Sequence, residues 1–140
     1  MAEKEYKGEL EDVEFDSSGF INAFSYAQPE TVNYLKSKGV SMSDFRPKIL
    51  NSSHLKNNDL ILTMEEAHKR KIFKKYKNVR DIDKKVYTLK EFTGNEDDVD
   101  IFDPYMKNHK SYLETMIEIE KNVDLAIQKI IKMKKGAESP

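Results

Sequence analysis

The chain has 140 residues, 38% of them hydrophobic, and its 24 basic and 25 acidic residues leave a net charge of −1. This length suits one domain with a single core, and the balanced charge favours neither nucleic acid nor an anionic membrane as a partner. Cysteine is absent, which excludes disulfides, thiolate metal sites and a cysteine nucleophile within these residues. His54, His68 and His109 share no helical ligand spacing, so we expect no metal. We expect no cofactor either.

The chain carries no sequence signal for a membrane. No apolar run approaches the length of a membrane span, and the first residues have neither the basic patch nor the apolar stretch of a secretory signal. We therefore expect a cytoplasmic protein.

The first forty residues predict a strand, an aromatic loop and a helix. Residues 1–10 are good helix formers without a capping residue, as if a helix were already under way. Val13–Ser18 alternates apolar and polar residues, which predicts a short strand. The aromatic loop Phe20–Gln28 either lines a pocket or covers the core. A helix is predicted over Pro29–Lys38, because proline suits the first turn and Gly39 a stop.

The middle of the chain predicts two further strands separated by a helix. After a short helix at Ser52–Asn57, the apolar run Asp59–Met64 has the pattern of a strand buried on both faces of a parallel sheet. Glu65–Tyr76 follows as a helix whose lysines indicate a solvated face rather than a nucleic-acid site. Lys85–Leu89 alternates as another strand.

The last third predicts an acidic loop, a stiff corner and a long helix. Of the carboxylates near this loop, Glu96, Asp97, Asp98 and Asp100 either form a solvated face, which we favour, or keep Asp103 protonated by like-charge repulsion. Pro104 keeps Asp103 out of the helical region, so its carboxylate either caps a turn or is aimed at a ligand. In Ser111–Lys135, apolar residues recur at steps of three and four, which predicts an amphipathic helix.

Strands that alternate with helices predict an α/β fold with a small, mostly parallel sheet flanked by helices. In such sheets ligands bind beyond the carboxyl ends of the strands. The loops 17–26, 64 onward and 92–106 would open at that edge. Asp103 lies on one of them, which favours its catalytic interpretation.

Several segments, in this order, resemble the low-molecular-weight protein tyrosine phosphatases. They are Asp16-Ser17-Ser18-Gly19, Asp59–Met64 with His68 behind it, Tyr87–Phe92 and Asp103-Pro104-Tyr105. Met1-Ala2-Glu3 also looks like the residues that follow the phosphate-binding loop of that family. The resemblance implies a three-layer sandwich over residues 1–140 as a single domain. It also implies phosphotyrosine proteins or small aryl phosphates as substrates.

The resemblance also implies roles for individual residues. Asp103 matches the aspartate that protonates the leaving phenol oxygen and later takes a proton from water. Ser17 would hydrogen-bond the phosphate loop, and Asn22 would lie at the mouth of the site. Tyr105, Phe24 and Tyr26 would flank the phenol ring.

The departures from the family concern the reacting groups themselves. The family's Cys-x5-Arg-Ser-Pro loop and its first strand are absent from this chain, so residues 1–140 are expected to be N-terminally incomplete and inactive alone. The unpaired sheet edge is a self-association hazard. Where the family often has His-Arg-x-Arg, this chain has Phe45-Arg46-Pro47-Lys48, which puts support of the phosphate loop by histidine in doubt.

Three interpretations fit these departures. The first, which we favour, is a fragment or shortened gene product, begun at an internal methionine, of an active phosphatase. The second is a non-catalytic binding module on the same fold. The third, an arsenate reductase-like protein, needs additional cysteines downstream of the phosphate loop and is disfavoured because this chain has none.

Overall fold

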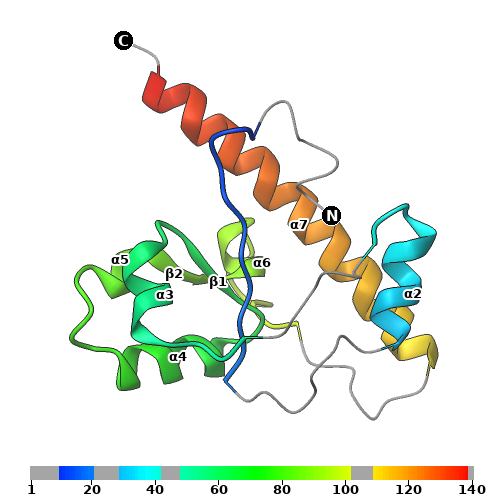
Figure 1. The fold of residues 1–140 in the computed structure, drawn as a ribbon, viewed down its shortest axis with the longest axis horizontal. Helices are drawn as coiled ribbons and strands as arrows, with labels where there is room; N and C mark the ends of the chain where they lie inside the picture. Colours follow the sequence, from blue (N-terminus) through cyan, green and yellow to red (C-terminus); the bar gives the residue numbers. More distant parts are fainter. Residues whose placement is uncertain (1–9, 21–28, 42–47, 102–108, 139–140) are drawn as a thin grey trace.

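Two short parallel strands lie among helices in this protein (Figure 1). The computed structural model describes residues 10–20, 29–41, 48–101 and 109–138. The strands are β1 (Ile61–Thr63) and β2 (Val86–Thr88). The helices, in chain order, are α2 (Pro29–Ser37), α3 (Ser52–Asn57), α4 (Glu66–Lys75), α5 (Ile82–Lys85), α6 (Leu89–Phe92) and α7 (His109–Glu138). The α/β class and the parallel strand pair predicted from the sequence are thereby confirmed.

One face of the strand pair packs against α3, α4 and α5. Ile61 and Val86 lie opposite each other in the parallel register. Both pack in a cluster with Leu55 of α3, Ile72 of α4 and Ile82 of α5. Leu55 is fully buried in this cluster, at 0% exposure. These helices therefore hold their places by burying apolar side chains against alternate strand residues.

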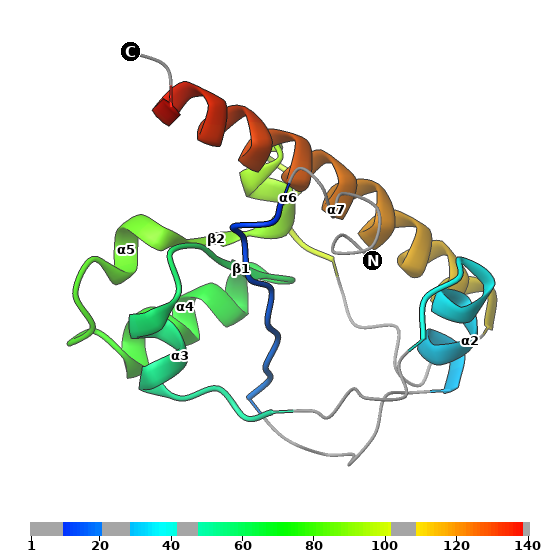
Figure 2. The same ribbon diagram turned by 45° about the horizontal axis from the view of Figure 1, so that its top comes forward.

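The other face packs against α6 and α7. Successive strand residues point to opposite sides of a sheet, so the next pair, Leu62 and Tyr87, faces away from the first cluster. This pair packs against a second cluster, formed by Leu89, Phe92, Ile101 and Ala126. Figure 2 shows α4 on one side of the two strands and α7 on the other. The strands are thus covered by helices on both faces, with Ile61, Leu62 and Tyr87 half-buried.

The long helix α7 covers the second cluster with its apolar face. Ala126 and Ile127 are buried, and the predicted apolar series between Tyr112 and Ile130 lies at buried or half-buried positions. Its first half also contacts α2, whose Tyr34 hydroxyl donates a hydrogen bond to a Glu120 carboxylate oxygen. The predicted amphipathic helix is confirmed. Among the helices in the described part of the chain, α7 included, none is long and apolar enough to cross a membrane.

The ends of several elements differ slightly from the prediction. The predicted helix Pro29–Lys38 ends one residue earlier, and Gly39 follows it with a φ of 77°, a left-handed conformation that glycine adopts without steric cost. The two strands are shorter than the apolar runs Asp59–Met64 and Lys85–Leu89. A strand extends only as far as its neighbour offers hydrogen bonds, which the apolar pattern does not specify. The predicted helix start in residues 1–9 lies outside the described residues.

The structure also contains short helices that were not predicted. α5 precedes β2, and α6 occupies Leu89–Phe92, where the sequence predicted the end of a strand and the start of an acidic loop. The Thr88 hydroxyl accepts a hydrogen bond from the Glu91 N–H, and the Glu91 carboxylate accepts one from the Thr88 N–H. This capping box has a recognisable sequence signal, Thr-x-x-Glu, which would have predicted α6.

The strand predicted over Val13–Ser18 is wrong. Among the described residues, this segment belongs to no strand pair, and Gly19 just after it forms an isolated parallel bridge to Ile49. The alternation correctly predicted which side is buried, because the apolar side chains of the segment pack near Ile127 of α7. Alternation reports burial on one face, whereas a strand also requires a hydrogen-bonded neighbour.

Candidate active site

The carboxyl ends of β1 and β2 form the edge at which the sequence predicts a ligand site. Thr63 and Thr88, both buried, are the last pair in the parallel register. The Thr63 hydroxyl donates to the Glu65 carbonyl at 3.0 Å, just before α4 begins. Thr88 caps α6 as described above. Both strands therefore turn directly into helices at this edge, the usual position of sites in parallel α/β sheets.

The segment that leads to Asp103 is attached to the same edge. The Ile101 N–H donates to the carbonyl of Met64, at the end of β1, over 2.7 Å. An Asp100 carboxylate oxygen accepts a hydrogen bond of 2.6 Å from the Glu66 N–H, in the first turn of α4. The N-cap residue of α4 makes no side-chain cap of its own, so Asp100 supplies this contact from a distant part of the chain. The prediction that Asp100 is merely solvated is therefore wrong.

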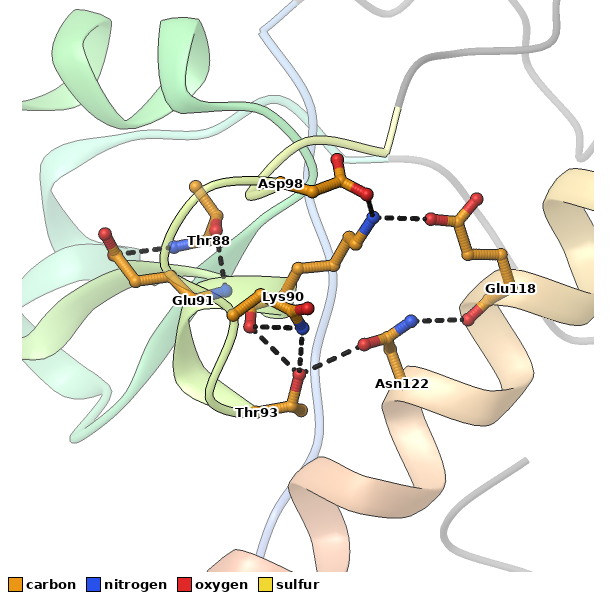
Figure 3. A network of polar contacts seen from close by, with 8 residues as sticks. Thr88, Lys90, Glu91, Thr93, Asp98, Glu118 and Asn122 are labelled. Carbon is orange, nitrogen blue, oxygen red and sulfur yellow. Dashed lines mark hydrogen bonds and ion pairs between the residues drawn. The ribbon is translucent and has the colours of Figure 1, made fainter.

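Lys90 joins the acidic connection to α7 (Figure 3). Its ammonium group donates to Asp98 at 2.5 Å and to Glu118 of α7 at 2.9 Å. Lys90 is only 7% exposed. Burial acts to lower the pKa of Lys90, but the hydrogen bonds and charges of Asp98 and Glu118 outweigh it and raise that pKa above its ordinary value. Lys90 is therefore charged at neutral pH, and Asp98 has a specific partner rather than being merely solvated.

A second set of polar contacts surrounds the Lys90 backbone (Figure 3). The Thr93 hydroxyl lies 3.0 Å from both the Lys90 carbonyl and the Asn122 amide oxygen. Asn122 is 5% exposed, and its side-chain N–H donates to the Glu118 carbonyl at 2.9 Å. Asn95 donates to the Lys90 carbonyl at 3.1 Å. These contacts fix the end of α6 against α7.

Ser17 lies exposed on the extended segment before Gly19. Its N–H donates to the Asp16 carboxylate at 2.9 Å. The same carboxylate is 2.7 Å from the Lys48 ammonium, whose hydrogen bond lowers the pKa of Asp16. The segment is thus tied to the chain around Lys48, and the contact of Ser17 with a phosphate loop stays a prediction.

The remaining predicted site residues lie outside the described part of the chain. They are Asn22, Phe24, Tyr26, Asp103 and Tyr105. For Asp103 and Tyr105, the structure describes the chain up to Ile101. Ile101 is 3% exposed in the second cluster, and its N–H donates to the carbonyl of Met64, just after β1.

Histidine does not form a metal centre in the described ranges. His68 of α4 lies 3.5 Å from the Glu65 carboxylate and 5.4 Å, between ring centroids, from Phe20. Within the residues that the structure describes, no three metal-ligating side chains are grouped to hold an ion. His68 therefore contacts the Glu65 carboxylate and the Phe20 ring at the surface of α4.

A hollow of about 500 Å³ lies at the opposite end of the strands. It is lined by Lys56, Asn58, Asp59, Arg80, Asp81, Lys84 and Lys85. Asp59 and Lys85 precede β1 and β2, so this hollow is remote from the edge that carries the predicted site. Its lining is mostly exposed and mixed in charge, and it adds nothing to the candidate active site.

Sequence reasoning missed the contacts of Lys90 with Asp98 and Glu118. Lys90 stands between the apolar residues Leu89 and Phe92, but its neighbours Thr88 and Glu91 are polar as well, so the local sequence gives no signal that Lys90 is buried. Its partners lie 8 and 28 residues away, so no local pattern pairs them.

Taken together, the parallel strands, the β–α turns at their carboxyl ends and the attachment of residues 100–101 define an α/β protein with a candidate site at that edge. The chain belongs to the low molecular weight phosphotyrosine protein phosphatase family, whose sequence model matches residues 1–136. The resemblance predicted from the sequence is confirmed.

Solved structures agree with this assignment. The low molecular weight protein tyrosine phosphatase from T. tengcongensis is 34% identical, with a TM-score of 0.77, over 90% of this chain and 84% of that one. The YwlE arginine phosphatase from Geobacillus stearothermophilus is 25% identical, with a TM-score of 0.70, over 79% and 68%. A YwlE mutant from Bacillus subtilis is 27% identical, with a TM-score of 0.69, over 96% and 88%. A comparison with curated proteins found no match.

Proposed function

We propose that this chain supplies the general acid of a phosphatase that hydrolyses phosphotyrosine or aryl phosphate monoesters when a Cys-x5-Arg loop is joined to it. The observation that carries the proposal is the family match over residues 1–136, a range that includes Asp103-Pro104-Tyr105. Family membership implies a phosphorylated substrate. Helices pack on both faces of the strand pair, which supports the three-layer sandwich of the family. The family's first strand would join this sheet.

The proposed reaction has two steps. A thiolate of the added loop attacks phosphorus, the bond to the phenol oxygen breaks, and Asp103 gives its proton to that oxygen. Asp103 then accepts a proton from water, which attacks phosphorus and breaks the P–S bond to release phosphate. The attachment of residues 100 and 101 to the carboxyl edge supports this role, because a general acid must start from a fixed scaffold.

The remaining proposed contacts concern the substrate. Ser17 would hydrogen-bond the phosphate loop, and Asn22 would lie at the mouth of the site. The rings of Phe24, Tyr26 and Tyr105 would flank the phenol ring of a phosphotyrosine protein or a small aryl phosphate. We place this reaction in the cytoplasm.

Residues 1–140 alone are proposed to be inactive. They contain no cysteine, so they cannot form the cysteinyl-phosphate. Within the described residues β1 pairs with β2, and the absent first strand of the family would add to this small sheet. An unpaired edge promotes self-association, which we propose as a property of residues 1–140 when the first strand is lacking.

Phosphoarginine is the second candidate substrate. The similarity to the YwlE arginine phosphatase, at 25% identity over 79% of this chain, favours it. Cleavage of a P–N bond would use the same donor, because the departing guanidine nitrogen also needs a proton. The choice between the two depends on the residues that surround the leaving group.

The test compares three proteins. The first is residues 1–140, the second is the chain preceded by a family-type first strand and Cys-x5-Arg-Ser-Pro loop, and the third carries serine in place of that cysteine. We expect turnover of p-nitrophenyl phosphate and a phosphotyrosine peptide by the second protein alone. Activity in residues 1–140 would refute the proposal. No activity in the second protein, if it is folded, would favour the non-catalytic binding module.

The role of Asp103 has its own test in the loop-bearing protein. Asp103→Asn removes the proton but keeps the shape, so kcat for aryl phosphates should fall roughly 10²- to 10⁴-fold, with a smaller change in KM. Assays with phenyl phosphate and phosphoarginine show which leaving group depends more on Asp103. An unchanged kcat for phenyl phosphate would remove Asp103 from the mechanism.

A further inference from the structure

We propose that Lys90 is a positioning residue for the general acid. Its ammonium group holds the acidic connection against α7, and residues 98–101, which precede Asp103 in the chain, are thereby kept in one arrangement. This inference rests on the proposed function, because it assigns Lys90 a task in proton donation by Asp103.

The first step of the argument is the position of Lys90 itself. It follows β2 closely and lies in α6, whose neighbours Leu89 and Phe92 are buried in the second cluster. The side chain is 9% exposed, and its ammonium reaches two carboxylates from different parts of the chain. A lysine that is buried and paired in this way is held in one geometry, because any other would leave its charge without partners.

The second step is what the two carboxylates belong to. Glu118 is on α7, which packs on the second cluster through Ala126, and the Glu118 side chain is 41% exposed. Asp98 is in the connection, and its side chain is 77% exposed. Because Asp98 is so exposed, its short contact with Lys90 attaches this part of the connection to α6 and α7, beyond the Asn95 hydrogen bonds to the Lys90 carbonyl.

The third step is the pair of attachments that follow Asp98. Asp100 accepts from the α4 N-terminus at 2.6 Å, and Ile101 donates to the end of β1 at 2.7 Å. The connection is therefore held from α7 through Lys90 and from β1 and α4 through residues 100 and 101. Residues 98–101, the last described residues before Asp103, are thus fixed at both ends.

Proton transfer is sensitive to the placement of the proton donor. A general acid must come within about 2.6–3.2 Å of the oxygen that it protonates. A misplacement of about 1 Å can cost up to roughly 10²-fold in rate. We therefore expect that removal of the Lys90 contacts slows proton donation by Asp103, while the nucleophilic cysteine and the fold are kept.

The test uses the loop-bearing protein and two substrates. Phenyl phosphate needs a proton on its leaving group, whereas 2,4-dinitrophenyl phosphate has a leaving group that departs as an anion. Lys90→Met should lower kcat/KM for phenyl phosphate by about 10- to 100-fold and change that for 2,4-dinitrophenyl phosphate far less. The substrate ratio is kcat/KM for phenyl phosphate divided by kcat/KM for 2,4-dinitrophenyl phosphate, and Lys90→Met lowers it. Glu118→Gln, which keeps Lys90, should lower the substrate ratio too, and Lys90→Arg should lower it less than Lys90→Met.

A matched control is Lys129→Met. The Lys129 ammonium also links α7 to α6, by donating to the Phe92 carbonyl at 2.9 Å, but Lys129 does not contact Asp98. The Lys129→Met variant should leave the substrate ratio unchanged. Equal losses for both substrates in Lys90→Met and Glu118→Gln would show a purely structural role and overturn the proposal.

Amide hydrogen exchange tests whether Lys90 fixes the connection, and this measurement does not require an active enzyme. In residues 1–140, Lys90→Met should speed exchange of the Ile101 amide, and Lys129→Met should not. Unchanged exchange at Ile101 would overturn the proposal. Asp103→Asn separates this outcome from failure of the proposed function: if it changes the substrate ratio and Lys90→Met does not, the positioning role alone is wrong. If Asp103→Asn leaves the ratio unchanged, the proposed function itself is wrong.

Discussion

Removal of the Asp100 carboxylate tests whether the acidic connection caps α4. In the structure this carboxylate accepts a 2.6 Å hydrogen bond from the Glu66 N–H, where the helix offers no other side-chain cap. The loss of an N-cap typically costs about 1 kcal/mol. The contact is partly accessible to water, which can replace the lost acceptor, so we expect Asp100→Ala to lower the free energy of unfolding by about 1 kcal/mol rather than more.

Asp100→Asn divides this effect into its two physical parts. The amide oxygen keeps an acceptor for the Glu66 N–H but removes the negative charge near the positive end of the helix dipole. Such a charge contributes typically about 0.3–1 kcal/mol. The asparagine variant should therefore lose about half as much stability as the alanine variant.

Urea unfolding of residues 1–140, followed by circular dichroism, measures these differences. With a slope of about 2 kcal/mol per molar urea, a loss of about 1 kcal/mol lowers the midpoint by roughly 0.5 M. Asp97→Ala is the matched control, because Asp97 is an exposed carboxylate in the same connection. Equal losses in Asp100→Ala and Asp97→Ala would refute the reasoning, since net charge would then explain the effect. Exchange of the Glu66 amide should also accelerate in Asp100→Ala alone.

Two further predictions concern the packing of the core and the contact between α2 and α7. Leu55→Ala removes a fully buried side chain and should destabilise the protein by about 2–5 kcal/mol in urea unfolding, whereas Met133→Ala, at 55% exposure, should stay within about 0.5 kcal/mol. Burial and the hydrogen bond to Glu120 raise the pKa of Tyr34 to about 12. Because the pKa of Tyr34 is higher in the folded than in the unfolded protein, protonated Tyr34 stabilises the fold. This stabilisation is complete below the unfolded pKa of about 10 and is lost as pH rises through the folded pKa. Glu120→Gln should lower the pKa of Tyr34 in a ¹³C-tyrosine NMR titration, and an unchanged value would contradict the assigned cause.

Local sequence signals determined those elements whose limits are set by neighbouring residues. Gly39 ends α2 because it takes a left-handed φ of 77°, and Pro29 begins it. The Ser52–Asn57 helix has the predicted limits, with a capping box between Asn51 and His54. Such stops and caps act within one turn, so they are visible in the sequence.

Strand limits depended on partners elsewhere in the chain. Val13–Ser18 has the alternation of a strand, and its apolar side does face the core, but among the described residues its only neighbouring bridge is that of Gly19 with Ile49. Likewise β1 is confined to Ile61–Thr63, where Val86–Thr88 lies in register. Hydrogen-bonding neighbours come from distant segments, and the hydrophobic pattern of one segment does not specify them.

The sequence by itself determined the α/β class, the parallel strand pair and the family, because periodicity and the order of short motifs are properties of the chain alone. The tertiary structure decided how the acidic connection is held. Asp98 and Asp100 belong to one run of carboxylates in the sequence, yet one meets the buried Lys90 and the other caps α4. Folding brings these charges to donors 8 and 34 residues away, and only this long-range proximity separates a positioned carboxylate from a solvated one.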